Sequence, residues 1–479
     1  MNDRHDPALP IASAIRAEGV QAPASAIRVE GVQPPASVTR AEVALLAALL
    51  FMVPLFEVPK NLLWLAWVWV SVAAWRREHA AGRPAQAWSL WDAAFAALLA
   101  AALLAGIGVA EPGRTLGAAG DSLRMLAVPW LMSRRRYRTD QIVPVLWAAV
   151  AGTLLATAWG FAALMMAARP MFLELNSVGH VNHSSIYLAI VFGCALALVL
   201  ADARRRPIGL ALAAAVLLAV ALLVASSRAS VGACVVFLVL LAATAPFAGA
   251  DPALAARRRR RFRVGLLVLV LAATGAYRLA IGLSDKRLQP EGQSLLEKFG
   301  FQASVGAPTS HRDGLLRLAW AAARAHPVFG LGNAGFRRLT PQSVCQELQP
   351  GSASEPCDPA RYYFSFHAHS LYANTLAERG AVGLAALLVL LGAWGLRLRS
   401  TLAWARTDHR RACVWVAALA GWSVTVFAGL LNTTLHHEHG LLALATLGML
   451  LSTGGGRRGD PVPSPVANKE TGLSARDTP

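Results

Sequence analysis

The chain has 479 residues, of which 56% are hydrophobic and only 15% are charged, and its mean hydropathy is +0.47. A soluble protein of this length would carry more charge, so the composition indicates an integral membrane protein. The net charge of +18 does not indicate a nucleic-acid-binding protein, because the arginines form short runs between apolar segments, which is the positive-inside pattern.

Residues 1–40 are polar and rich in Pro, Ala and Ser, and they predict a disordered cytoplasmic tail. Twelve apolar segments follow, and several approach the ~20 residues that a helix needs to cross a bilayer. They lie at 42–58, 61–75, 88–110, 118–133, 141–168, 183–202, 207–226, 229–249, 263–283, 369–396, 412–432 and 438–453. The sequence therefore predicts an all-α integral membrane protein with about 12 transmembrane helices, nine within 41–283 and three within 369–453, before a disordered cytoplasmic tail at 454–479.

The distribution of basic residues orients these helices. With a cytoplasmic N-terminus, the five inner loops hold 21 basic residues, whereas the short outer loops hold only Lys60, Arg114, Arg169 and Arg228. Shifting the count by one helix would destroy this asymmetry, so both termini are predicted to be cytoplasmic. Residues 284–368 then form one long extracytoplasmic loop.

This loop is too long to be a passive connection. Its segment 310–326 predicts an amphipathic helix with Leu315, Leu316, Ala319 and Trp320 on one side, which Pro327 ends. Cys345 and Cys357 share the same loop, and we expect them to form a disulfide in an oxidising compartment.

Several polar residues fall at the predicted outer ends of the helices. They are Arg124, Asn182, His183, Arg228, Arg312, His369 and the run His436–His439. Paired arginines suit a phosphate, because each guanidinium offers two donors in a fork and keeps its charge. A histidine such as His369 suits a general base, since it is largely neutral near neutral pH. Arg228 and Arg124 have the alternative of being ordinary snorkelling side chains.

The run His436–His439 could also suggest a metal site. It lacks the HxxxH zinc spacing with a carboxylate partner, and no CxxC spacing occurs elsewhere. We interpret it as a polar turn that lines the cavity and expect no bound metal.

Three short motifs occur along the predicted outer face. They are Ser226–Ser230, the run from His311 and Arg312 through Trp320 and Pro327 to Gly332, and Phe366–Leu384 with His369, Gly380 and Gly383. Their order, with the long loop before the last three helices, resembles the O-antigen ligase and polymerase superfamily, and most of all its lipopolysaccharide O-antigen ligases. The narrower ligase pattern has Thr where Leu384 stands here.

This resemblance implies a GT-C-like fold and a metal-independent inverting glycosyltransferase of the bacterial inner membrane, with its active site facing the periplasm and no cofactor. Such an enzyme transfers a glycan from undecaprenyl diphosphate to a hydroxyl of the lipid A-core, so its partners are lipids rather than nucleic acid. By position, His369 would be the catalytic base, and Arg228 and Arg312 would bind the donor diphosphate. Further substrate-binding candidates are Arg124, His183, Asn182 and Glu378. An O-antigen or exopolysaccharide polymerase would use the same donor, and a protein O-oligosaccharyltransferase is a more distant alternative.

His369 is preferred to His367 as the base because of its spacing to two glycines. Gly380 and Gly383 lie 11 and 14 positions further on, near the same helical face if one helix continues through all three residues. His367 lies outside that register, and we expect it to cap or orient the loop.

Overall fold

The computed structural model describes residues 38–82, 88–106, 112–166, 173–201, 205–225, 227–245, 252–284, 311–348 and 357–453. Over these ranges the protein is all-helical, and no strand occurs in them. The predicted tails lie almost entirely outside the described residues, as does the part of the predicted loop at 285–310.

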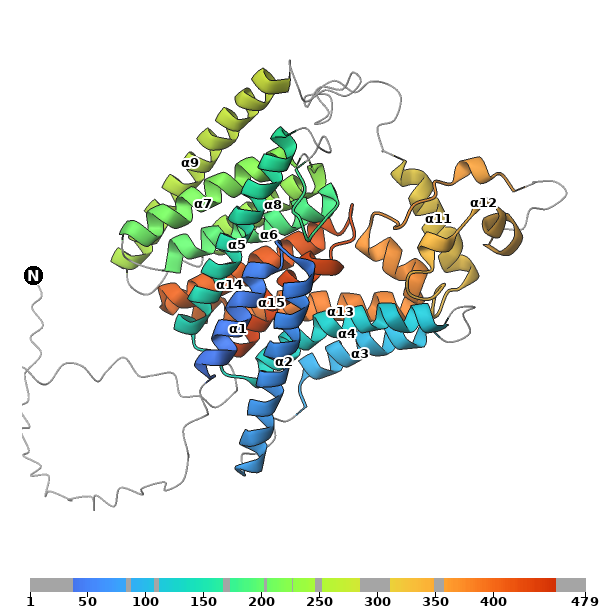
Figure 1. Ribbon diagram of the computed structural model, residues 1–479, viewed down its shortest axis with the longest axis horizontal. Helices are drawn as coiled ribbons and strands as arrows, with labels where there is room; N and C mark the ends of the chain where they lie inside the picture. The colour runs from blue at the N-terminus through green and yellow to red at the C-terminus, as the bar shows by residue number, and fades with distance from the viewer. Residues whose placement is uncertain are drawn as a thin grey trace, which may run out of the picture. The chain divides into compact units, whose positions relative to one another are not determined.

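Each of the twelve apolar segments contains a helix, as Figure 1 shows. These helices are α1 (Arg40–Met52), α2 (Glu57–Ala80), α3 (Leu90–Leu104), α4 (Pro112–Arg134), α5 (Thr139–Met165), α6 (Val181–Ala201), α7 (Arg205–Val224), α8 (Arg228–Thr244), α9 (Pro252–Ser284), α13 (Leu371–Thr407), α14 (His409–Ser423) and α15 (His437–Thr453). A π-helical segment, η4 (Val424–Ala428), continues α14. The predicted loop contributes α11 (Arg312–Ala325) and the short α12 (Pro341–Ser343).

Five of the described helices are long and apolar enough to cross a membrane. They are Thr139–Met165, Val181–Ala201, Arg206–Val224, Leu371–Thr407 and His409–Ala428. Two further apolar helices, α3 and α8, are shorter. A helix rises 1.5 Å per residue, so each of the five is about as long as the ~30 Å hydrocarbon thickness of a bilayer or longer. The chain therefore has the helices of a membrane protein.

Helix α6 lies among other helices and is buried nearly all round. It packs against α5, α7, α8, α14 and α15, which explains why its sequence is apolar on every side. Gly193 allows α6 and α14 to approach closely, because a Cβ at this position would lie 2.2 Å from the Cβ of Ala420. Small residues at such contacts are typical of packed membrane helices.

Buried ion pairs join helices that are distant in the sequence. Arg135 donates from Nε to Glu42 on α1 at 2.8 Å, and it also pairs with Glu78 on α2. Lys60 at the start of α2 pairs with Glu438 at the start of α15. A buried charge without its partner is costly, so these pairs fix which helix ends lie together.

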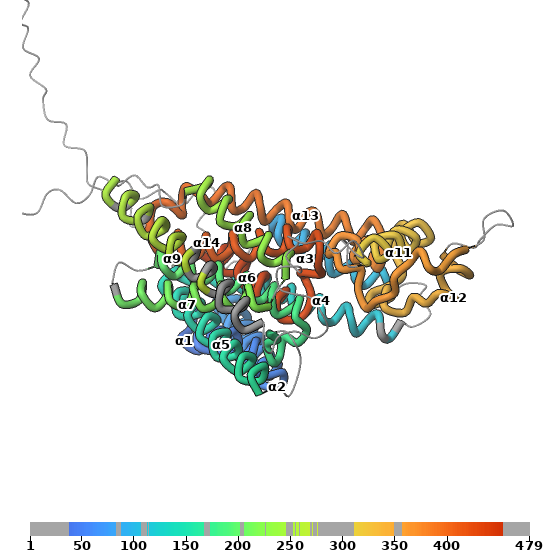
Figure 2. Tube along the Cα trace, turned by 90° about the horizontal axis from the view of Figure 1, so that it is seen from above, coloured from blue at the N-terminus to red at the C-terminus, as the bar shows by residue number. Residues whose placement is uncertain are grey.

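Helix α11 packs against α13, as Figures 1 and 2 show. The helix lies where the sequence predicts it, but the predicted buried face is partly wrong. Leu315 and Ala319 are buried, whereas Leu316 is 48% exposed and Trp320 is 59% exposed. Leu318 takes their place in the buried cluster, which also contains side chains of the loop and of α13. The core of this region is thus formed with α13, and two large apolar side chains stay on the outside.

The predicted disulfide between Cys345 and Cys357 is present, with the two Cα atoms 5.5 Å apart. The bridge spans a sequence separation of 12 residues.

The predicted unbroken helix after His369 is wrong in one respect. Helix α13 begins only at Leu371 and is interrupted at Gly380, where φ is 62° and ψ is −164°. The segment after α11 crosses α13 at this break, and Ala381 donates its backbone N–H to the carbonyl of Pro327 at 2.8 Å. Because the break reorients the chain, Gly380 and Gly383 do not share a helical face with His369, and that reason for preferring His369 does not hold.

Candidate functional site

Four helices begin close to one another, and each brings a polar residue to the same place. His183 lies in the first turn of α6, and Arg228 is the first residue of α8. His369 lies two residues before α13, and His436 lies directly before α15. Arg312, the first residue of α11, completes the set. These five of the predicted outer-face residues come together from segments far apart in the sequence.

Arg228, Arg312 and His369 form one half of the site. Arg312 is half-buried, and its pKa is lowered by burial and by the positive charge of Arg228. The pKa of His369 is lowered by burial and by the charge of Arg312, while the neighbouring Asn432 amide acts in the opposite direction. Among the described residues, no carboxylate is a cause of either shift, so this half of the site is cationic and suits an anionic ligand.

The backbone around His369 is held in an unusual conformation. His369 has φ of 46°, in the left-handed region, which is uncommon for residues other than glycine. Two contacts hold the next residues: the Ser370 hydroxyl caps α13 by accepting from the N–H of Ala373, and the N–H of Leu371 donates to the carbonyls of Gly429 and Asn432. Strained residues of this kind concentrate at functional sites, which supports His369 as a site residue independently of any helical register.

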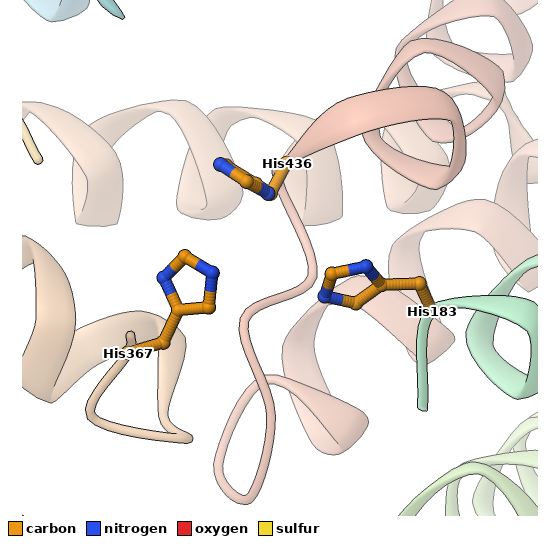
Figure 3. A group of neighbouring side chains, drawn as sticks. All are labelled: His183, His367 and His436. Atoms are coloured by element: carbon orange, nitrogen blue, oxygen red, sulfur yellow. The ribbon is translucent and has the colours of Figure 1, made fainter. Parts of the chain in front are cut away.

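Histidines form the other half of the site. We call His183, His367 and His436 the histidine triad; each offers a ring nitrogen, and these nitrogens all lie within 4.8 Å of one another (Figure 3). The ring centroids of His367 and His436 are 5.0 Å apart, and those of His183 and His436 are 6.0 Å apart. Burial, followed by the charge of His369, lowers the pKa of His367 to about 4, so its imidazole is neutral near neutral pH.

Two more histidines border the triad. The ring centroids of His437 and His439 lie 5.5 Å and 5.1 Å from that of His183. The His439 side chain is fully buried, and its Nε2 lies 3.0 Å from the carbonyl oxygen of Thr433. The run His436–His439 is thus part of a larger histidine group, which the sequence spacing alone does not show.

The other predicted site residues occupy different surroundings. Arg124 donates to the side-chain oxygen of Asn61 at 2.9 Å, beside the Lys60–Glu438 ion pair. Asn182 is half-buried and directly precedes His183 on α6. Glu378 is buried on α13 and accepts the backbone N–H of Phe336, so it holds the loop after α11. We therefore regard Glu378 as a positioning residue.

A cavity of about 70 Å³ is lined by residues of α3, α4, α13 and α15 and of the turn before α15. Its wall is mostly apolar, with Glu378, Arg379 and His436 among its polar lining residues. The Arg379 guanidinium donates to Asn333 at 2.7 Å and to Ser122 at 3.0 Å, so it joins the loop to α4. His436 borders both this cavity and the histidine triad.

The sequence reasoning missed several residues of the site. Asn432 lies beside His369, and both His180 and Arg337 are close enough to influence the pKa of His367. Asn432 had a visible signal, since Asn432-Thr433-Thr434 is a polar run that follows an apolar segment. His180 and Arg337 had none, because nothing local to them suggests a site.

No protein-family model matches the chain, and no curated protein matches it in sequence.

Proposed function

We propose that the chain is an inverting glycosyltransferase of the O-antigen ligase type, which transfers a glycan from undecaprenyl diphosphate to an acceptor hydroxyl. The observation that carries this proposal is the convergence of Arg228, Arg312 and His369 from three separate segments. Two neighbouring guanidiniums and one imidazole are the groups that such a transfer requires.

The chemistry follows from the roles of these groups. The acceptor hydroxyl oxygen attacks the anomeric carbon of the donor glycan, its proton passes to the imidazole of His369, and a new carbon–oxygen bond forms. The bond between that carbon and the diphosphate oxygen breaks on the opposite side, which inverts the configuration. Arg228 and Arg312 bind the departing diphosphate and stabilise its developing charge. No metal ion takes part in this chemical step.

The arrangement of helix ends supports the predicted topology. Counted as predicted spans, α2, α4, α6, α8, α13 and α15 are even-numbered, and a cytoplasmic N-terminus requires every even-numbered span to begin at the outer side. The starts of α6, α8, α13 and α15 are those that form the site. We propose that the twelve helices lie in the bacterial inner membrane with the site facing the periplasm, where a membrane-anchored diphosphate reaches the two arginines.

The proposed acceptor is a hydroxyl of the lipid A-core. A polymerase would use the same donor and the same three residues and would differ only in accepting another lipid-linked glycan.

The proposal is tested with the purified chain and an undecaprenyl-diphosphate glycan donor. Lys keeps the charge of Arg but loses its two-donor fork, so Arg228→Lys and Arg312→Lys should each weaken donor use while the protein still folds. Arg317→Lys is the matched control, because Arg317 lies on the same helix as Arg312 but is exposed. Full activity of both site variants would contradict the proposed diphosphate site.

A further inference from the structure

The histidine triad is drawn from three separate parts of the chain. His183 belongs to the first turn of α6, His367 to the loop before α13, and His436 to the turn before α15 (Figure 3). All three side chains are partly buried, and their ring nitrogens face a common space. The proposed transfer reaction uses none of these three imidazoles as its base.

The spacing of the triad fits a metal ion after a small adjustment. A point equidistant from three atoms that are 4.8 Å apart lies about 2.8 Å from each, and zinc binds imidazole nitrogen at about 2.0–2.1 Å. Each ring nitrogen therefore has to move inward by about 0.7 Å if the ion lies in the plane of the three nitrogens, and by about 0.9 Å at most in a tetrahedral site. Rotation about the two side-chain torsions of a histidine provides a movement of this size.

Buried nitrogen atoms near the triad lack hydrogen-bond partners. Nδ1 of His436 and Nδ1 of His439 are both buried, and neither has a partner within the part of the chain that the structure describes. The Thr433 carbonyl can only accept, so Nε2 of His439 carries the hydrogen and Nδ1 presents a lone pair when the ring is neutral. Buried polar atoms without partners call for an explanation, and a bound ion is one of the few available.

The hydrogen bond between His439 and a backbone carbonyl is of a kind that metal-binding histidines commonly make. Such a histidine binds the metal through one ring nitrogen and donates the N–H of the other to a carbonyl or carboxylate. This hydrogen bond fixes the tautomer and the orientation of the ring. His439 is thus prepared to act as a further ligand or to orient one, with its ring centroid 5.1 Å from that of His183.

The donor set determines which metal the site would take. Neutral imidazoles suit zinc and its neighbours among the transition metals, whereas magnesium and calcium require oxygen ligands. Three histidines with one open position match the coordination of zinc sites that keep a water or a substrate atom as the fourth ligand.

We propose that His183, His367 and His436 bind one Zn²⁺ ion at the outer ends of α6, α13 and α15. The ion joins these three segments, and because His367 lies two residues before His369, it also fixes the loop that presents the proposed base. This proposal does not rest on the transfer reaction, since zinc binding is measured without any substrate.

The test uses the full-length chain, purified in detergent through an affinity tag without histidines. The protein is stripped with a chelator, loaded with Zn²⁺, desalted and analysed for metal by mass spectrometry. We expect about one zinc per chain, and four-coordinate visible absorption bands when Co²⁺ replaces Zn²⁺. The triple variant His183→Gln/His367→Gln/His436→Gln should lose the zinc. A control with His79→Gln, His326→Gln and His409→Gln should keep it, because these histidines lie outside the group.

Three results would overturn the proposal. The first is failure of the stripped wild-type chain to retain zinc, the second is a Co²⁺ spectrum of six-coordinate type, and neither result needs a variant to be interpreted. The third is equal zinc content in the two triple variants, with both proteins monodisperse. If the chain transfers a glycan but binds no zinc, the proposed zinc site is wrong and the proposed function still stands.

Discussion

Replacing Gly380 by Ala should damage the protein severely. The residue has φ of 62° and ψ of −164°, a region that only glycine occupies readily. A Cβ here would lie 2.2 Å from the carbonyl oxygen of Val328 and 2.6 Å from the backbone nitrogen of Phe329. Both neighbours are backbone atoms, so no side chain can rotate away to make room.

The cost can be worked out from these contacts. The strained conformation costs about 1–3 kcal/mol for a residue with a Cβ. The displaced segment would also lose the hydrogen bond from Ala381 to Pro327 (2.8 Å) and the one from Leu331 to Ala377 (2.9 Å). At about 1 kcal/mol for each bond, the total is roughly 3–5 kcal/mol. The proposed activity should fall as well. The displaced segment links α11, which begins with Arg312, to α13, which follows His369.

The assay is thermal unfolding of the detergent-purified chain, followed by its tryptophan fluorescence. Gly392→Ala is the matched control: Gly392 lies on the same helix, and a Cβ there would meet nothing within 4 Å. Because Ala favours a helix over Gly by up to about 1 kcal/mol, the control should be neutral or slightly stabilised. Equal unfolding midpoints for Gly380→Ala and the wild type would refute the role assigned to this break in α13.

Three further predictions follow from the described contacts. Arg135→Met removes the cation that pairs with the buried Glu42 and with the partly buried Glu78, and it should lower the free energy of unfolding by about 3–5 kcal/mol, whereas Arg138→Met, at an exposed pair, should leave the unfolding midpoint unchanged. Replacing both Cys345 and Cys357 by Ser should destabilise the folded chain by about 3 kcal/mol on the chain-entropy model, measured as the same midpoint, and an unchanged midpoint would contradict it. If the predicted loop is extracytoplasmic, a cysteine at the exposed position of Arg317 should react with a membrane-impermeant reagent in intact cells. The three free native cysteines are buried and should give little background. Reaction only after lysis would contradict the predicted topology.

Much of the helical fold could be predicted from the sequence, because hydrophobic segments are local signals. The twelve apolar segments each contain a helix, and the amphipathic segment that becomes α11 was recognised from its period. The face that α11 buries was not recognised correctly, since it depends on where α13 lies. The break at Gly380 was missed for a similar reason: a glycine in an apolar helix gives no sign that another segment will cross it.

The candidate site was predictable only in part. Arg228 and His369 stood out because each is polar beside an apolar segment at a predicted outer end. The histidine triad was not visible, because His183, His367 and His436 lie far apart in the sequence and no spacing rule connects them. Metal-site motifs detect ligands on one helix or one loop, and they cannot detect ligands that tertiary packing brings together.

The measurement that tests the proposed function most directly is the structure of the lipopolysaccharide made by a strain that lacks this chain. A ligase predicts lipid A-core without any attached glycan, restored by the wild-type chain and by His326→Ala. His369→Ala should fail to restore it, because the loss of a general base typically costs about 10²–10⁴-fold in rate. A core that still carries a single glycan repeat would indicate a polymerase instead. Unchanged lipopolysaccharide, or full restoration by His369→Ala, would contradict the proposed ligase and its base.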